Sequence, residues 1–164
     1  MYKPVVCALF AVCGLPISAQ RSAEAAAPNL DGTYMLVRRV MAGGKELKSP
    51  AIEGLYTLSH GHGNLNIFWK KEDGKLASES TIMRYKLTVG QYCEWIVYTV
   101  RNEIDVPGIT NEAPPITNHC TPLKIHDGKI VFAPPGEGVT TTFDRNGFTA
   151  VIEGELSDTW IKLR

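Results

Sequence analysis

Two histidines stand one residue apart in the segment LYTLSHGHGNLNIFW, residues 55–69. Imidazole is the commonest metal ligand in proteins. In an extended strand His60 and His62 would project to one face, as a shared metal requires. The other interpretation is that Gly61 and Gly63 make a tight turn, so that the histidines sit at the tip of a hairpin and face solvent.

Residues 54–62 match the start of the cupin metal motif, a glycine followed after five residues by His-x-His. The motif then needs a glutamate three or four residues after the second histidine, and Asn66 and Ile67 stand there instead. The remaining histidines, His119 and His126, lie in or beside predicted turns. Because a metal site needs three or four convergent ligands, the pattern favours the hairpin, and no metal or other cofactor is predicted.

Three charged side chains lie in strand-like runs where they could act on a bound molecule. Arg38 lies on an apolar face of the run 33–42 and could hold a carboxylate or carbonyl, since guanidinium donates hydrogen bonds in a planar fork. A surface position or a structural ion pair is the favoured alternative, because buried charges require partners. Glu79 and Glu94 would act as acid or base if they faced inward, where desolvation raises the pKa of a carboxyl. Such glutamates more often face water, and no catalytic residue is assigned.

Aromatic and sulfur-containing side chains recur on one face of several runs and could line a cavity. An apolar pocket with a few polar groups is the usual site for a small apolar molecule, but the same pattern also fits an ordinary packed core. The candidate ligand-binding residues are Tyr34, Arg38, Tyr56, Trp69, Met83, Tyr85 and Trp95.

The N-terminal segment has the features of a secretory signal peptide, with Lys3 before an apolar run from Pro4 to Leu15 and small residues before the cleavage point. That run is shorter than the ~20 residues that span a bilayer, so no membrane span is expected. We expect a signal peptide over 1–19, a flexible leader over 20–29 and a single domain over 30–164. The protein is therefore predicted to be secreted or otherwise exported, to an extracellular or periplasmic space.

The composition limits the classes of partner. The chain has 17 basic and 17 acidic residues, so its formal net charge is zero, and no basic stripe is present. This balance argues against nucleic acid or an anionic membrane as a partner. The predicted partner is a small apolar molecule, and the sequence carries no signal for the oligomeric state.

Four cysteines are present, and Cys7 and Cys13 leave with the predicted signal peptide. In an exported chain the remaining pair, Cys93 and Cys120, is expected to form a disulfide. A catalytic or metal-binding thiol is the alternative, and the absence of Cys-x-x-Cys spacing argues against it.

Short runs rich in Val, Ile, Thr, Tyr, Phe and Trp alternate with turn residues along the whole body of the chain. Glycine follows aspartate or asparagine in several breaks, such as 127–128 and 146–147, where a tight hairpin needs a positive φ. No stretch has a sustained period of 3.6 residues. Eight to ten sequential strands with short turns predict an all-β fold, an up-and-down antiparallel β-barrel, which removes the exposed edges of an open sheet.

Alternation within the runs predicts which side chains share a face. Tyr34, Leu36 and Val40 share a face with Arg38, whereas in 92–102 both faces are apolar and the pattern assigns no facing. The segment 103–119 holds three prolines and no alternation. It is expected to be a loop, either a lid over a pocket or a loop at the barrel rim.

Four segments carry a family resemblance. The first, LDGTYMLVRRV, has Tyr34 where a Gly-x-Trp opening would have tryptophan. The others are two hairpin-like segments and a closing strand, namely EGLYTLSHGHGNLNIFW, TPLKIHDGKIVFAPP and DTWIKLR. In these segments the chain, over about 30–164, resembles the lipocalin-like domain family, within the calycin group of small β-barrels.

The resemblance implies a barrel that is closed at one end and open at the other. An eight-stranded barrel is wide enough to hold one small ligand. Family members mostly bind apolar small molecules, and some barrel relatives are cyclases or isomerases. At the closed end, Lys162 or Arg164 is expected to lie over the ring of Tyr34 as a cation against an aromatic face.

The predicted barrel suggests two functions, one as a binding protein and one as an enzyme. The first is a secreted barrel that binds a small apolar molecule by desolvating its surface. The second is a cofactor-independent cyclase or isomerase that holds a flexible apolar substrate in one reactive conformer. A third and weaker reading is a solid barrel whose loops bind a partner protein.

Overall fold

The computed structural model describes residues 28–71, 73–103, 110–112, 119–136 and 138–164. The predicted signal peptide, nearly all of the predicted leader and most of the segment 103–119 lie outside the described residues, so these remain predictions. Within 103–119, Thr110–Glu112 forms a short strand paired with residues 99–101, so the prediction of a loop is wrong at these positions. Every regular element in the described residues is a β-strand. Accordingly, that part of the chain contains no helix that is long and apolar enough to cross a bilayer.

The strands follow one another along the chain and are joined mostly by short turns. Thirteen are present in the described ranges: β1 (Gly32–Met41), β2 (Glu46–Leu47), β3 (Ile52–Ser59), β4 (His62–Lys70), β5 (Leu76–Leu87), β6 (Gln91–Glu103), β7 (Thr110–Glu112), β8 (Cys120–Pro122), β9 (Lys124–His126), β10 (Lys129–Phe132), β11 (Val139–Asp144), β12 (Gly147–Ile152) and β13 (Leu156–Lys162).

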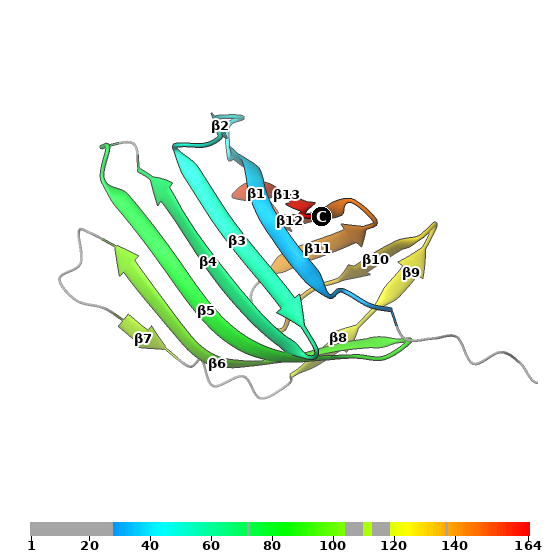
Figure 1. Cartoon of the computed structure of the whole chain (residues 1–164). Coiled ribbons are helices and arrows are strands. Elements are labelled where there is room, and N and C mark those ends of the chain that lie inside the picture. The colour runs from blue at the N-terminus through cyan, green and yellow to red at the C-terminus, as the bar shows by residue number, and fades with distance from the viewer. Residues whose placement is uncertain (1–27, 72, 104–109, 113–118, 137) are drawn as a thin grey trace, which may run out of the picture.

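One antiparallel sheet contains all of these strands, in the order β7-β6-β5-β4-β3-β1-β13-β12-β11-β10-β9, with β2 on β1 and β8 on β6. Figure 1 shows β3–β6 as one long curved wall and β9–β13 as a second wall. The pairing of β1 with β13 joins the two walls. At the other side, β8 pairs with β6 and leads directly into β9, the last strand of the second wall. The predicted all-β, up-and-down antiparallel barrel is confirmed. Nine of the described strands have four or more residues, which agrees with the predicted eight to ten.

The two histidines lie at the turn between β3 and β4. Ser59 pairs with His62, and His60 and Gly61 between them have φ angles of 48° and 79°. Two consecutive positive φ values are typical of the two-residue turns that match the twist of a hairpin. The hairpin interpretation of HGH is therefore confirmed, and both histidines are exposed at the barrel end.

The chain that enters β1 closes this end of the barrel. Leu30 is buried, and its carbonyl accepts a hydrogen bond of 2.7 Å from the hydroxyl of Tyr34. The hydroxyl of Tyr85 donates to the carboxylate of Asp31 at 2.6 Å. Lys162 donates to the backbone carbonyl of Asp31 and lies 5.6 Å above the ring of Tyr34. The expected cation over Tyr34 is therefore present, and it is Lys162.

A β-bulge interrupts β1 at Val37. Opposite it on β13, Leu36 pairs with Trp160 and Arg38 pairs with Thr159, so Val37 has no residue facing it. A bulge inserts one extra residue into a strand, and because side chains alternate with a period of two, the insertion exchanges the two faces beyond it.

The bulge corrects the predicted facing of β1. Tyr34 and Leu36 are buried as expected, but the prediction that Arg38 shares their face is wrong. The side chain of Arg38 lies outside and pairs with Glu46 at 3.3 Å, with about half of its surface exposed. Arg39 takes the inward position instead.

A second bulge sets the facing of β6, which the sequence left open. Ile82 of β5 pairs with Tyr98, and the next residue, Met83, pairs with Ile96, so Val97 is the inserted residue. Ile96 lines the interior, whereas Tyr98 and Val97 are exposed on the outer surface. Both faces of this strand are apolar because the inward phase changes at Val97.

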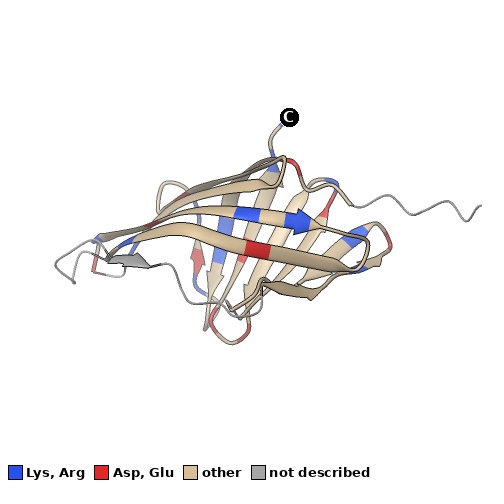
Figure 2. Ribbon diagram, turned by 90° about the horizontal axis from the view of Figure 1, so that it is seen from below, with Lys and Arg blue, Asp and Glu red and all other residues tan. Residues whose placement is uncertain are grey.

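Charged residues are distributed over the whole barrel. In Figure 2 the blue and red segments are separated by long tan stretches, and no continuous stripe of one sign follows the strands. This distribution accords with the zero formal net charge of the chain.

Candidate functional site: the cavity inside the barrel

The barrel encloses a cavity of about 740 Å³. That volume lies within the range of small-molecule sites, which is roughly 300–1,000 Å³. Most of its wall is apolar, and the side chains come from both sheet walls. They include Leu58, Leu65, Ile67, Phe132, Phe148 and Trp160. The interior of the barrel thus contains a chamber and is not packed throughout by its own side chains.

Three of the predicted ligand-binding residues line this cavity. Tyr56, Trp69 and Met83 stand on β3, β4 and β5, and the three strands are neighbours in the sheet. The hydroxyl of Tyr56 lies 3.2 Å from the sulfur of Met83. Alternation places these side chains inward, as the sequence pattern indicates.

Two other candidates are buried outside the cavity wall, at the closed end. The ring of Tyr34 packs edge-on against Phe143 and Phe148, with centroids 5.5 and 5.2 Å apart. Burial, and then the nearby carboxylate of Asp31, raises the pKa of Tyr34 to about 12. Burial likewise raises the pKa of Tyr85, and its hydrogen bond to Asp31 adds to the effect. Both tyrosines therefore stay protonated at neutral pH and act as structural parts of the barrel floor.

The last two candidates face outward. Arg38 is on the outer surface, for the reason given by the Val37 bulge. Trp95 is 38% exposed and stacks on the ring of His119, with centroids 5.6 Å apart. Neither side chain lines the cavity.

A bidentate ion pair stands in the cavity wall beside Trp69. The guanidinium of Arg39 donates from Nε and Nη2 to the two carboxylate oxygens of Asp158, both at 2.7 Å. Its carbon Cζ lies 5.6 Å from the centre of the Trp69 ring. Only 11% of the Arg39 side chain and 7% of the Asp158 side chain is exposed. The pair thus provides a rigid polar feature in a largely apolar wall.

Further polar groups line β5 and β6. Arg101 donates to Glu79 at 2.9 Å, and this pair is the more exposed of the two in the cavity wall. The hydroxyls of Thr81 and Thr99 are hydrogen-bonded to each other at 3.0 Å and are buried. Each of these four side chains therefore has its main partner within the wall.

Glu94 is a buried carboxyl of the wall that is hydrogen-bonded at only one of its two oxygens. It stands on β6, lines the cavity and is only 2% exposed. Its Oε2 accepts a short hydrogen bond from the hydroxyl of Tyr92, whereas its Oε1 is buried and has no hydrogen-bond partner among the described residues. Desolvation raises the pKa of the Glu94 carboxyl above its usual value, and the bond from Tyr92 opposes this only in part. The prediction that an inward, desolvated glutamate would have a raised pKa thus applies to Glu94.

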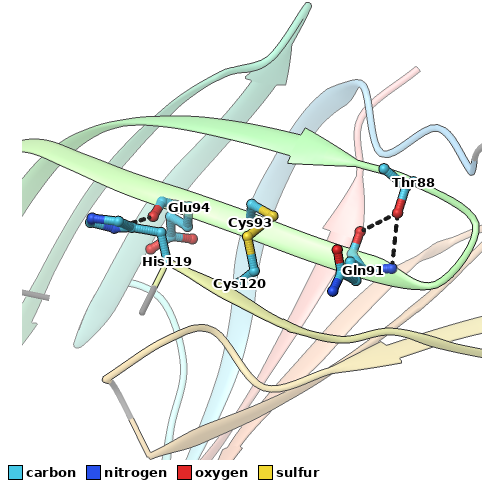
Figure 3. Close-up of a disulfide and its surroundings, with 6 residues drawn as sticks. All are labelled: Thr88, Gln91, Cys93, Glu94, His119 and Cys120. Atoms are coloured by element: carbon cyan, nitrogen blue, oxygen red, sulfur yellow. Dashed lines mark hydrogen bonds between the residues drawn. A yellow bond between two sulfur atoms is a disulfide. The ribbon is translucent and has the colours of Figure 1, made fainter. Parts of the chain in front are cut away.

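The backbone of Glu94 is held by hydrogen bonds to His119, which immediately precedes β8 (Figure 3). The amide of Glu94 donates to the carbonyl of His119 at 2.8 Å, and the imidazole of His119 lies 3.1 Å from the carbonyl of Glu94. The adjacent residue, Cys93, faces Cys120 in the β6–β8 ladder, and the predicted Cys93–Cys120 disulfide is present. This covalent link ties the end of the segment 103–119 to the strand that carries Glu94.

Among the described residues, no three His, Cys, Asp or Glu side chains gather in a way that could hold a metal ion. His60 and His62 lie at the hairpin tip, and the nearest polar partners of their rings are Ser59 and the backbone of His60. The polar groups that line the cavity are carboxyl, phenol, hydroxyl and guanidinium groups.

Sequence reasoning missed several polar residues of the wall, among them Arg39, Arg101 and Asp158. In the run DTWIKLR, alternation alone would have placed Asp158 on the same face as Trp160. Arg39 and Arg101 lie beyond bulges, and nothing in the local pattern marks the inserted residue.

Comparison with known proteins leaves the family open. No protein-family model, no curated protein and no solved structure matches this chain.

The two adjacent arginines of β1 provide a matched test of the bulge. Arg39→Ala leaves Asp158 without its partner in the wall, and we expect a loss of about 3 kcal/mol in the free energy of unfolding. Arg38→Ala removes an exposed ion pair and should change it by less than about 0.5 kcal/mol. Urea denaturation measures both; equal effects would contradict the assigned facing of β1.

The raised pKa of Glu94 predicts a pH-dependent stability. A buried acid whose pKa is higher in the folded state loses stability as pH rises through its unfolded value toward its folded value. Glu94→Gln, which removes the charge, should therefore stabilise the unliganded protein at pH 7. We expect its free energy of unfolding to rise by about 1–3 kcal/mol, and its unfolding temperature to rise with it. The gain should shrink toward zero near about pH 4.

The exposed Glu153 is the matched control for this experiment, because Glu153→Gln removes a carboxylate that is already solvated. It should leave the unfolding temperature nearly unchanged at every pH. Thermal melts across the pH range compare the three proteins. A lower unfolding temperature for Glu94→Gln at pH 7 would contradict the assignment of a desolvated carboxyl.

Proposed function

We propose that this protein is an exported, lipocalin-like barrel that binds a small apolar molecule in its cavity. The observation that carries the proposal is the largely apolar chamber of about 740 Å³ inside a nearly closed antiparallel barrel. The resemblance of the segments 30–40 and 158–164 to a lipocalin-like opening and closing strand is consistent with it.

Binding would be driven by desolvation. A molecule that enters the chamber removes its own apolar surface and that of the wall from water, which contributes about 25 cal/mol per Å². Rigid walls limit the entropy that binding must overcome. Here the aromatic floor, with Phe143 and Phe148 stacked 4.5 Å apart, and the paired Arg39 and Asp158 keep the chamber preformed.

Export is supported by two independent features. The N-terminal segment has the composition of a signal peptide. The Cys93–Cys120 disulfide suits an oxidising compartment, since such bonds persist mainly outside the reducing cytosol. We infer that the ligand is met outside the cytosol, in an extracellular or periplasmic space.

A second candidate function, a cofactor-independent cyclase or isomerase, is favoured by one observation. Glu94 is a buried carboxyl in a largely apolar cavity, and desolvation raises its pKa, which favours the proton that a general acid must hold. It could donate its proton to an apolar substrate and regain one when the rearranged product forms. The chamber would then hold the substrate in its reactive conformer.

The binding function is tested by filling the chamber from one wall. Ala150 lines the cavity on β12, and its neighbour Val151 is exposed on the outer face. Ala150→Trp should raise the Kd of the uncharged fluorescent probe N-phenyl-1-naphthylamine at least about tenfold, whereas Val151→Trp should change it less than about twofold. Fluorescence titration measures both. Equal affinity in all three proteins, or no binding to the wild type, would contradict the proposal.

The enzymatic alternative is tested by proton exchange. Acyclic isoprenoid hydrocarbons incubated with the protein in D₂O should yield rearranged products that carry deuterium, and Glu94→Gln should abolish their formation. Mass spectrometry of the extracted hydrocarbons measures this. Recovery of unchanged, unlabelled hydrocarbon from the wild type would contradict catalysis and leave the binding function in place.

A further inference from the structure

We propose that Glu94 anchors the polar end of the ligand and that this end is a protonated amine, so that the natural ligand is an apolar body with one cationic nitrogen. The inference rests on the proposed binding function and names the ligand class of the same cavity. It starts from the unpartnered Oε1 of Glu94, which is buried in the cavity wall.

The charges of the cavity wall leave Glu94 without a counter-ion. Two arginines and four carboxyl groups line the cavity. Arg39 is paired with Asp158 and Arg101 with Glu79, so the guanidinium groups are already engaged. Of the other two acids, Glu155 is exposed and solvated. Glu94 alone is both buried and without a cationic partner among the described residues.

A buried carboxyl with one oxygen unpaired destabilises the folded protein unless a hydrogen-bond donor or a cation pairs with that oxygen. An acid that has no role could be replaced by an apolar side chain of similar size at no loss of stability. The structure instead orients it: the hydroxyl of Tyr92 holds Oε2, and the ring of Tyr92 stacks on Phe132 at 4.0 Å. The unpartnered Oε1 therefore belongs to a carboxyl that Tyr92 holds in place, and a fixed carboxyl is what a preorganised anchor requires.

The sign of the missing partner follows from the charge count. Because the described wall has an excess of acid over base, a ligand cation gains from the whole cavity, whereas a ligand carboxylate would meet repulsion at Glu94. An ammonium donates hydrogen bonds and carries the opposite charge, so it satisfies Oε1 on both counts. A neutral hydroxyl can supply only the hydrogen bond. The apolar remainder of the wall, such as Leu58 and Leu65, then takes the hydrocarbon body.

The experiment compares three probes that share one hydrocarbon chain and differ only at the polar end: decylamine, decanol and decanoate. Isothermal titration calorimetry at pH 7 measures the Kd of each for the wild-type protein. We expect decylamine to bind about tenfold more tightly than decanol, and decanoate to bind most weakly. This order is measured on the wild type alone, so it does not depend on whether any variant folds.

The second arm removes the charge of the anchor. Glu94→Gln should bring decylamine to the affinity of decanol, while the Kd of decanol should change less than about threefold. Glu153→Gln, on the exposed turn after β12, is the matched control and should keep the full preference for the amine. Circular dichroism confirms that each variant is folded before its titration.

The outcomes distinguish binding in the cavity from the preference for a cationic ligand at Glu94. If none of the three probes binds the wild type, the cavity-binding function and the anchor are both overturned. If all three bind with similar affinity, or if decanol binds best, the binding function stands and the cationic ligand is overturned. If Glu94→Gln keeps the preference for the amine while folded, Glu94 is not the anchor.

Discussion

A strand in a closed sheet has one face in water and one face in the interior, and the residue that takes each position is fixed by a period of two. In this chain the dry faces of both sheet walls meet around an open volume instead of interdigitating completely. The floor is sealed by Leu30 and by the aromatic rings above it, which leaves the rest of the interior hollow. Fold, site and proposed ligand class all depend on this sorting of side chains between two faces.

Two insertions of a single residue decide which polar side chains face the chamber. At Val37 the extra residue turns Arg38 out to Glu46 and brings Arg39 in against Asp158. At Val97 the change of phase lets β6 present Glu94 on one side of the bulge and Arg101 on the other. Bulges are enriched near functional sites because they re-aim side chains without ending a strand. Here they set the polar groups of an apolar cavity.

The barrel could be predicted from the sequence because its signals are local. Turn chemistry identified the hairpins, as at His60 and Gly61, and alternation placed Trp69 and Met83 on apolar faces that line the cavity. The pairing of Cys93 with Cys120 followed from the small number of cysteines expected in the mature chain. Each of these predictions uses only neighbours in the sequence or a count of residues.

The site was less predictable because its decisive features are not local. A bulge depends on the pairing of two strands, so Arg38 was assigned the place that Arg39 occupies. The partner of Arg39 lies 119 residues away, and no local pattern joins them. Glu94 was recognised as a group that would matter only if it faced inward, and the two apolar faces of its strand concealed which way it points. Tertiary pairing supplied what the pattern lacked.

The central claim is that the interior of the barrel is a chamber for a small molecule, and the content of the chamber can be measured directly. Native mass spectrometry of the protein, purified from its own source without organic solvent, compares the intact mass with the mass after denaturation. The account predicts an additional mass that is released on denaturation and that belongs to an apolar amine. Bare protein in repeated preparations, with no small molecule released, would contradict it.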